Sequence, residues 1–490
     1  MAVGLKAKLC VVAMWACVGL LGCFSPVKYA TDLEVPRLEA SYGDVSLEGE
    51  IVDRWWESYG DANLNAYVTA VLEHNPTLHV AYLRLVDSEL SYRQSVSGYY
   101  PDVSFGAGVG YGGTASSESK SDPSYSLGLT ASYEVDLWGK VRAQKRIGEL
   151  TVQSSRDAAE TAAISLVGNV VTQWFTIQYT RDRKALTEEL LSISEDYCRL
   201  VEEYYRNGQT TGMDVLEQRQ QIETLRATLK EQETTIRVGL HALEILSGRQ
   251  VMPHVEGSLP EQVVMGGTPN IDALLERRPD LRSARRQVES ADAQVVVALA
   301  NRLPSLKLSA SLAFRSSSIV DLFKALIWDV GANLVVPLFD GFQQTTAIDR
   351  AKVSYLLEET SYFLAVYEAV AEVEEALLML SLREQQLLDA RAELARQREI
   401  LDVSREYFVE GALDYSRVLT ALRGLITTSQ SELDARRQVL LAQVAVYKAM
   451  GGATWLEETS ERGVERARTR LETIGETQEV EDDTGHEEGK

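Results

Sequence analysis

The sequence contains little cysteine and little histidine. Four cysteines occur among 490 residues, and Cys198 is the only one after position 23. An exported chain of this kind would have no internal disulfide, so helix packing and strand pairing must hold it together. Five histidines are present, and no two of them have the spacing that places metal ligands on one face of a helix. No metal site is therefore predicted.

Motifs for catalysis and cofactor binding are also missing. No glycine-rich phosphate loop follows a predicted strand, and no nucleophile motif occurs. Since an enzyme needs convergent catalytic groups, we predict a protein that is not an enzyme, with no catalytic residue and no cofactor. The net charge of −23 argues against non-specific binding to nucleic acid.

Long apolar runs are confined to the start of the chain. Lys6 and Lys8 precede an apolar run over residues 9–21, which is typical of a secretory signal and too short to span a bilayer. No later run approaches 18 apolar residues, so no transmembrane helix is predicted. The run Leu20-Leu21-Gly22-Cys23 resembles the lipobox of bacterial lipoproteins, which implies cleavage before Cys23 and acylation of that residue. The alternative is an ordinary signal peptide with an incidental Cys23.

The chain contains an internal duplication. Short motifs recur with one fixed separation of 203 residues, over about 140 residues of each copy. A single match would mean little, whereas four in one register indicate a repeated structural unit. The matched motifs are Asn75-Pro76-Thr77-Leu78 with Arg278-Pro279-Asp280-Leu281, Tyr100-Pro101-Asp102-Val103 with Leu303-Pro304-Ser305-Leu306, Glu203-Tyr204-Tyr205 with Glu406-Tyr407-Phe408, and Val215-Leu216 with Val418-Leu419.

The duplication predicts the division of the chain. The end of the sequence is rich in Asp and Glu and lacks an apolar period, which is typical of disorder. We predict a signal peptide (1–22), a lipid-anchored segment (23–62), a first repeat (63–252), a linker (253–269), a second repeat (270–452) and a charged, disordered tail (453–490).

Each repeat contains two stretches in which apolar and polar residues alternate. The first begins at Val103 and its copy at Leu306; the second begins near Ser126 and its copy near Trp328. Strict alternation predicts strands with one apolar and one polar face. Two environments fit: a sheet that covers a soluble core, or the wall of a membrane barrel whose polar face lines a wet lumen. Four strands cannot close a membrane barrel, and open edges are not tolerated in lipid, so the second case requires several chains to share one barrel.

Very long helices follow the strands. Residues 140–207 contain no proline and two glycines, and residues 342–410 contain neither. Each stretch would be roughly 100 Å long at 1.5 Å per residue, and its apolar spacing of three and four predicts coiled-coil packing. Glycine-containing breaks at Gly208 and Gly411 turn the chain back into a second helix in each repeat.

Five motifs accompany the helices and strands of this pattern. They are Trp55-Trp56, His74-Asn75-Pro76-Thr77-Leu78, Arg277-Arg278-Pro279-Asp280-Leu281, Tyr133-Glu134-Val135-Asp136-Leu137-Trp138-Gly139-Lys140 and Val336-Pro337-Leu338-Phe339-Asp340-Gly341. With these motifs, the assembled pattern resembles the TolC-type outer-membrane efflux factors, in the lipoprotein branch, over roughly residues 50–452. After Gly341 the family usually has a second glycine and an arginine, where this chain has Phe342 and Gln343.

The resemblance implies a fold and a set of partners. The fold is mainly α: long coiled-coil helices form a hollow α-helical barrel in the periplasm, and four strands per chain contribute to a twelve-stranded transmembrane β-barrel shared by a homotrimer. The expected partners are outer-membrane lipid, a periplasmic adaptor and an inner-membrane pump, often of the resistance-nodulation-division type. The chain would be the passive exit duct for small molecules. A factor for type I protein secretion and a lipid-anchored coiled-coil structural protein remain alternatives; the latter predicts no conductance.

The resemblance also implies a gate near the glycine-containing breaks. The family pattern Gly-x-x-x-Tyr-Leu-x-x-Leu-Asp-Ala appears here as residues 411–421, with Thr420 in place of the usual gate aspartate. The repeat aligns Asp214 with Arg417, and these residues are predicted to form ion pairs between the helical hairpins. Arg423 is a further gate candidate. The sequence does not identify the transported substrate.

Overall fold

The computed structural model describes residues 54–112, 122–261, 271–324, 326–451, 455 and 459–470. The predicted signal peptide, Cys23 and the acidic end of the chain after residue 470 lie outside the described residues. The chain divides into two compact units. Unit 1 includes residues 87–155 and 283–363, and unit 2 includes the described residues before 87, those of 156–282 and those after 363. Each unit thus takes residues from both predicted repeats.

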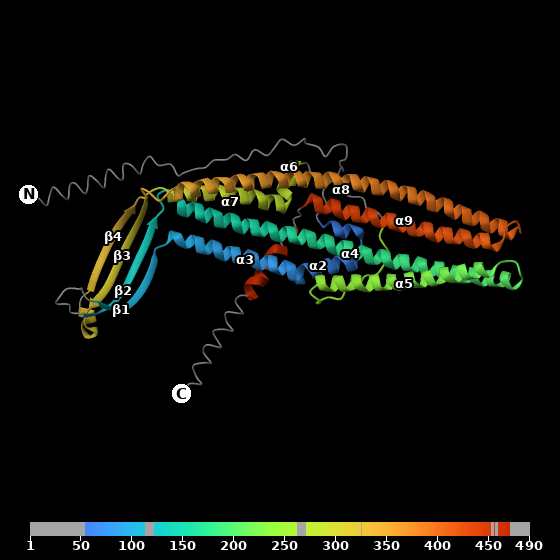
Figure 1. The fold of residues 1–490 in the computed structure, drawn as a ribbon, viewed down its shortest axis with the longest axis horizontal. Helices are drawn as coiled ribbons and strands as arrows, with labels where there is room; N and C mark the ends of the chain where they lie inside the picture. Colours follow the sequence, from blue (N-terminus) through green and yellow to red (C-terminus); the bar gives the residue numbers. More distant parts are fainter. Residues whose placement is uncertain are drawn as a thin grey trace, which may run out of the picture. The chain divides into compact units, whose positions relative to one another are not determined.

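Unit 1 contains one antiparallel sheet of four strands in the order β1-β2-β3-β4 (Figure 1). The two predicted strand pairs are confirmed. The last strand ends at Val335, although the apolar alternation continues to Leu338, because Pro337 has no N–H to donate to a strand ladder. The strands are β1 (Asp102–Gly112), β2 (Asp122–Val135), β3 (Ser305–Ser316) and β4 (Leu326–Val335).

The register of the sheet places like residues in rows across all four strands. Pairing of Phe105 with Leu129, of Leu129 with Leu312 and of Leu312 with Trp328 forms one apolar row. The neighbouring positions form a polar row on the other face, because successive side chains of a strand point to opposite sides. That polar row contains Ser104, Thr130, Ser311 and Asp329.

Helices form most of the described chain, as the proline-free stretches predict. The two longest, α4 (Lys140–Arg206) and α8 (Gln343–Val409), are the predicted long helices and lie within two residues of the predicted bounds. No helix in the described part of the chain is long and apolar enough to cross a membrane. The remaining helices are η1 (Trp55–Tyr59), α2 (Ala62–His74), α3 (Pro76–Val96), η2 (Ser97–Tyr99), α5 (Gly212–Leu246), α6 (Ile271–Arg277), α7 (Pro279–Asn301), η3 (Ile319–Lys324) and α9 (Tyr415–Met450).

The core of unit 2 is built around aromatic side chains. Trp174 and Phe175 of α4 are fully buried, and Tyr59 contacts Phe175 edge to face at 4.9 Å between ring centroids. Trp55 stacks on Tyr447 of α9 at the same distance. Buried aromatic pairs of this kind contribute about 0.5–1.5 kcal/mol beyond the area they bury. The short helix η1 is therefore fixed against α4 and α9.

The two repeats attach their helices by matched hydrogen bonds. The side chain of Asn75 donates to the carbonyl of Leu246 at 2.8 Å, and the guanidinium of Arg278 donates to the carbonyl of Ala449 at 3.1 Å. Donor and acceptor are both displaced by 203 residues between the repeats, so one contact occupies the same place in each copy. It joins the start of one helix to the end of the helix that returns.

Residues 459–470 form a helix, although the sequence placed them in the charged tail predicted to be disordered. Their charged residues share the helix with apolar ones, and Val464 and Ala467 are buried, as is Trp455 just before the helix. Burial of these side chains gives the segment the apolar contacts that a disordered tail lacks.

Candidate functional site

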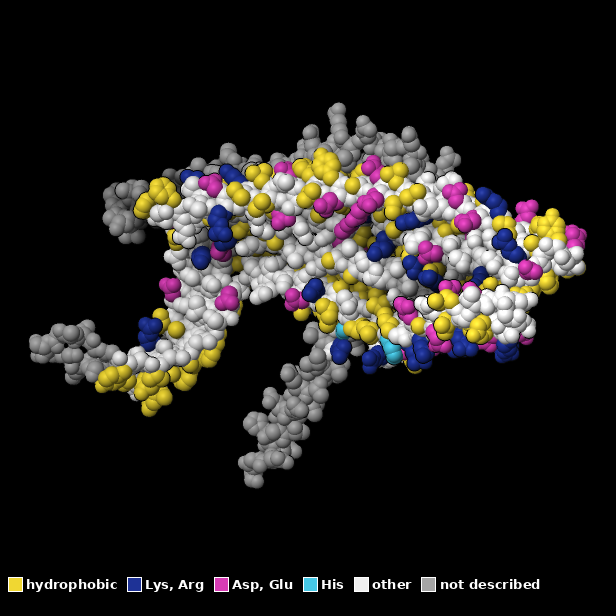
Figure 2. Space-filling view, turned by 45° about the vertical axis from the view of Figure 1, so that its right-hand side comes forward, with side chains coloured by type: hydrophobic (Ala, Val, Ile, Leu, Met, Phe, Trp, Pro, Cys, Tyr) yellow, Lys and Arg dark blue, Asp and Glu magenta, His cyan; other side chains and the backbone are white. Residues whose placement is uncertain are grey.

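The apolar face of the sheet is exposed to solvent in the single chain. Phe105 is 66% and Trp328 72% exposed, and the same face carries exposed Val109, Tyr111 and Val330. Figure 2 shows hydrophobic side chains gathered along the sheet, at the lower left of the view. This face therefore covers no core among the described residues. Of the two environments that the alternation allowed, the sheet that covers a soluble core is excluded. Contiguous exposed apolar surface of this kind marks a membrane or protein contact.

Among the residues that the structure describes, no strand pairs with either outer edge of the sheet. In the order β1-β2-β3-β4, only β2 and β3 are paired on both sides. The outer edges of β1 and β4 consequently present unpaired backbone N–H and C=O groups. Such edges are not tolerated in the hydrocarbon of a bilayer unless further strands pair with them.

The junction between β2 and α4 is held by the residues of the strand-end motif. The side chain of Asp136 accepts from the backbone N–H groups of Val141 and Arg142 at 3.1 and 3.2 Å, which satisfies donors at the start of α4. Trp138 donates its indole N–H to the carbonyl of Pro304 at 2.7 Å. The motif in the first repeat thus caps a helix and attaches it to the start of β3.

The matching junction in the second repeat contains backbone strain. Gly341 has φ +65° and Phe342 has φ +71°, so two consecutive residues adopt the left-handed region before α8 begins. Glycine tolerates this conformation, whereas a bulky side chain rarely adopts it. Phe342, which stands where the family usually has a second glycine, is the strained residue.

The two long hairpins turn back at matched glycines. Gly208 and Gly411 have φ values of +69° and +73°, as a glycine that ends a helix requires. The amides that follow donate to carbonyls five residues back: Gln209 to Tyr204 and Ala412 to Tyr407, each at 2.8 Å. These bonds end α4 and α8 in the same way.

Asp214 closes the first of these turns from within its own helix. Its Oδ2 accepts from the side chain of Thr210 at 2.5 Å and from the backbone N–H of Thr211 at 2.8 Å, and Thr211 caps α5 in return. These hydrogen bonds, led by the one from Thr210, lower the pKa of the Asp214 carboxyl to about 2. The carboxylate therefore stabilises the start of α5 locally.

Arg423 joins the two hairpins. From α9, its Nη2 donates to Gln218 Oε1 of α5 at 2.9 Å and to Ser194 Oγ of α4 at 3.3 Å. Its guanidinium carbon lies 4.9 Å from the centroid of the Tyr197 ring. Partial burial lowers the pKa of Arg423 from its usual value. Because an arginine guanidinium is not deprotonated in proteins, the group remains a cation.

The other gate candidates do not connect the hairpins within one chain. Asp214 and Arg417 form no ion pair with each other among the described contacts, and the backbone of Arg417 donates to Asp414 at the start of α9. Thr420 donates its hydroxyl to Ser416 one turn earlier at 2.9 Å. The sequence did not single out Ser194, Tyr197 or Gln218, because each lies on a helix other than α9 and only the fold brings them to Arg423.

Within the described ranges, no group of three or more His, Cys, Asp or Glu side chains is arranged to hold a metal ion.

Comparison with known proteins identifies what this arrangement is similar to. The profile of the family described as outer membrane efflux protein matches residues 68–249 and 270–452. The pyoverdine export outer membrane protein OpmQ of Pseudomonas aeruginosa is 29% identical over 455 residues, covering 89% of this chain and 95% of OpmQ. The cation efflux system protein CusC of Escherichia coli K12 is 24% identical, covering 81% of this chain and 88% of CusC.

Solved structures share the fold. The outer-membrane channel OprN superposes with a TM-score of 0.80 at 22% identity, covering 89% of this chain and all of that structure. A crystal structure of CusC superposes with a TM-score of 0.77 at 22% identity, covering 87% of this chain and all of that structure.

Proposed function

The chain belongs to the outer membrane efflux protein family and is an outer-membrane exit duct for efflux, and from this premise we propose that three copies assemble into one channel. The single observation that carries the proposal is the four-stranded sheet with an exposed apolar face and two open edges. Three such sheets joined edge to edge form twelve strands, so β1 of one copy pairs with β4 of the next. The joined sheet has no edge left in the bilayer.

The same assembly forms a passive duct that works with partner proteins. The polar rows of the sheet line the lumen of the barrel, and the helices continue the duct into the periplasm. The chain itself does no chemistry and holds no cofactor, so an inner-membrane pump must supply the energy. A periplasmic adaptor connects the pump to the duct. Exposed apolar side chains near the hairpin turns, among them Met213, Leu216 and Val409, offer that adaptor a contact surface.

The proposal includes the segments of the chain. Residues 63–252 and 270–452 are two repeats joined by a linker over 253–269, and a lipid-anchored segment over 23–62 begins after a signal peptide over 1–22. Residues 453–490 follow as a charged tail. Acyl chains on Cys23 hold the duct at the outer membrane, since each buried methylene of a lipid anchor contributes about 0.8 kcal/mol.

Gating is proposed to use charged and polar contacts between the hairpins. Arg423 is the gate candidate with contacts to both α4 and α5, so it holds the hairpins together in the closed duct. Asp214, Arg417 and Thr420 lie at the same end of the hairpins and act through contacts with neighbouring copies.

Cross-linking between strand edges tests the assembly. A chain with Ser104→Cys on β1 and Asp329→Cys on β4 carries its new thiols on opposite edges of its own sheet. We expect oxidation or a short bifunctional reagent to produce a ladder of dimer and trimer in outer membranes. The control carries Ser104→Cys with Thr130→Cys of β2, which lie opposite each other in one chain and should give no ladder. Absence of the ladder from the first variant, in every reagent length tried, contradicts the shared barrel.

A further inference from the structure

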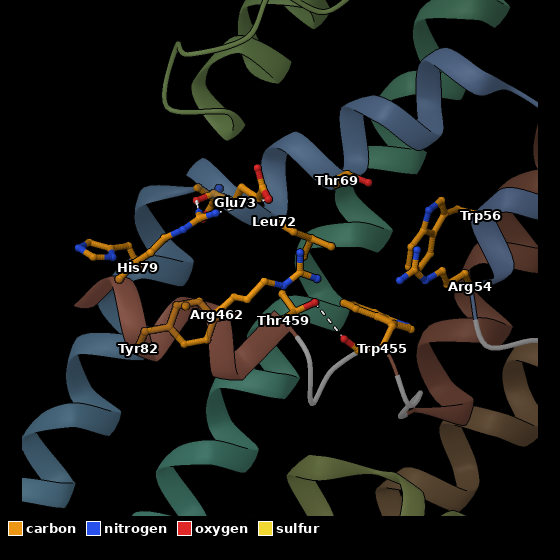
Figure 3. Close-up of a pocket in the computed structure, with 13 residues that line it drawn as sticks. Arg54, Trp56, Thr69, Leu72, Glu73, His79, Tyr82, Trp455, Thr459 and Arg462 are labelled. Atoms are coloured by element: carbon orange, nitrogen blue, oxygen red, sulfur yellow. Dashed lines mark hydrogen bonds and ion pairs between the residues drawn. The ribbon is translucent and has the colours of Figure 1, made fainter. Parts of the chain in front are cut away.

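A cavity of about 180 Å³ lies where the helix of residues 459–470 packs against α2 and α3 (Figure 3). The carboxyl-terminal part of the chain supplies one wall, and residues before position 83 supply the other. The contact is tight: a Cβ on Gly463 would collide with the ring of Tyr82. The helix is also attached by Arg466, whose Nη1 donates to the carbonyl of Glu73 at 2.7 Å.

The cavity is basic, although the chain as a whole is strongly acidic. Arg54, Arg462 and Arg466 all line it, and Glu73 is the only carboxylate among the lining residues of this cavity. Glu73 forms an ion pair with Arg466 at 3.4 Å, and Arg54 forms one with Glu57, which lies outside the lining, at 3.5 Å. The lining itself still contains three arginines against one carboxylate. In Figure 3, Arg462 extends from the carboxyl-terminal helix toward Leu72, and Arg54 lies beside Trp56. A net charge of −23 makes this local excess of cations unusual for the chain.

Aromatic side chains and additional donors complete the lining. Trp56 and Trp455 meet edge to face at 5.1 Å between ring centroids. The indole Nε1 of Trp455 is buried and has no hydrogen-bond partner in the structure, although the side chain is only 5% exposed. A buried donor left without a partner is costly, so each such group in a native protein calls for an explanation, such as an ordered water or a bound ion. Burial raises the pKa of Tyr82 to about 12, so its hydroxyl keeps its proton and remains a donor at neutral pH.

We propose that this cavity binds a small aromatic anion: a single ring that carries a phosphate or carboxylate group. Guanidinium groups recognise these anions through paired, charge-assisted hydrogen bonds. The indole rings and Tyr82 provide the apolar surface for the ring. A cavity of about 150 Å³ is large enough for benzene, so a volume of about 180 Å³ accommodates one ring. All residues that line the site belong to one chain, so the proposal does not rest on how the duct assembles.

Calorimetric titration of the full-length protein in detergent with phenyl phosphate tests the site. We expect saturable binding that is tighter than that of inorganic phosphate, which lacks the ring, and of phenol, which lacks the anion. Arg462→Gln should weaken binding about tenfold or more, because it removes charge-assisted hydrogen bonds. Arg54→Gln should do the same from the opposite wall, where the folding of the carboxyl-terminal helix is not involved.

Arg468→Gln is the matched control. It makes the same change of charge on the same helix at a residue that does not line the cavity, and it should leave the affinity unchanged. No saturable binding of phenyl phosphate, or equal weakening by Arg468→Gln and Arg462→Gln, overturns the proposal.

Carboxylates from the acidic end of the same chain are the alternative occupant that the test must separate from a free ligand. A full-length variant with Glu479→Gln, Glu481→Gln, Asp482→Asn and Asp483→Asn distinguishes the two sources. Unchanged affinity in this variant supports a free ligand as the occupant. Affinity raised about tenfold or more also supports the site and identifies the chain's own tail as a competitor for it.

Discussion

Arg423→Met is the substitution that should most directly release the closed state of the duct. Methionine keeps the unbranched apolar part of the side chain but removes the charge and every donor. The contacts that disappear are those to Gln218 and Ser194 and the placement over the Tyr197 ring. All three connect α9 to α4 or α5, so they are lost whenever the hairpins separate.

The magnitude follows from these contacts. The 2.9 Å hydrogen bond from a charged donor contributes about 1.5 kcal/mol, and the longer one about 0.5 kcal/mol. The cation–π contact adds about 0.5–1 kcal/mol at a partly exposed site. Arg423 Nε is buried without a hydrogen-bond partner, so its removal stabilises the closed state by about 1 kcal/mol and offsets part of the loss. The net loss of about 1.5–2 kcal/mol per chain shifts the closed-to-open equilibrium about 10- to 30-fold toward the open state.

Single-channel recording in planar bilayers measures this shift as open probability and mean conductance. Arg417→Met is the matched control, because it removes the same charge from the same helix at an exposed residue whose side chain forms no hydrogen bond or ion pair with α4 or α5 in the structure. We expect Arg423→Met to open the channel and Arg417→Met to have less than a third of that effect. A double-mutant cycle with Gln218→Ala should show coupling, since both changes break one hydrogen bond. Equal effects of the two methionine variants would refute the reasoning.

Other predictions follow from single contacts. Arg278→Ala should destabilise the protein by about 2–3 kcal/mol in thermal unfolding, and Arg278→Lys should not restore it, because the guanidinium bonds Asp280, Glu372 and Ala449 at once. Phe342→Gly should stabilise by about 0.5–1 kcal/mol, since it relieves a left-handed residue at some entropic cost, whereas Gly341→Ala should destabilise; denaturant titration measures both. The Asp214 pKa is lowered from 3.8 to about 2, so its stabilisation of α5 is complete above pH 4 and lost as the pH falls toward 2. Hydrogen exchange at the first amides of α5 should follow that window, and Asp214→Asn should abolish the dependence.

Much of the fold is determined by periodicities that a single sequence displays. Alternation of period two predicted the four strands, and the absence of proline and the scarcity of glycine predicted the long helices. The fixed separation of 203 residues then related the two copies, and it holds even for the hydrogen bonds of Asn75 and Arg278. These features are local or strictly repeated, which is why the sequence reveals them.

The contacts of the gate candidates could not be derived in the same way. Asp214 and Arg417 are aligned by the repeat, yet the Asp214 carboxylate is engaged by Thr210 and Thr211 beside it. Local hydrogen bonds compete with longer-range pairing whenever Ser, Thr or Asp lies near a helix start. Arg423 contacts residues more than 200 positions away, which depends on how the helices pack side by side.

The helix of residues 459–470 was missed for a related reason. Its arginines and glutamates are typical of a charged tail. The few apolar residues that anchor it are buried only because the helix packs against α2 and α3, and that packing is not visible in the sequence. Glycine is unfavourable inside a helix, yet the lack of a side chain at Gly463 permits the close approach of Tyr82.

The native mass of the detergent-extracted mature protein tests the central claim most directly. We predict a mass of three identical chains, each beginning at an acylated Cys23. A trimer without acyl mass would retain the shared barrel and remove only the lipid anchor. A monomer or dimer, in detergents that preserve the channel activity of the extract, would contradict the twelve-stranded barrel.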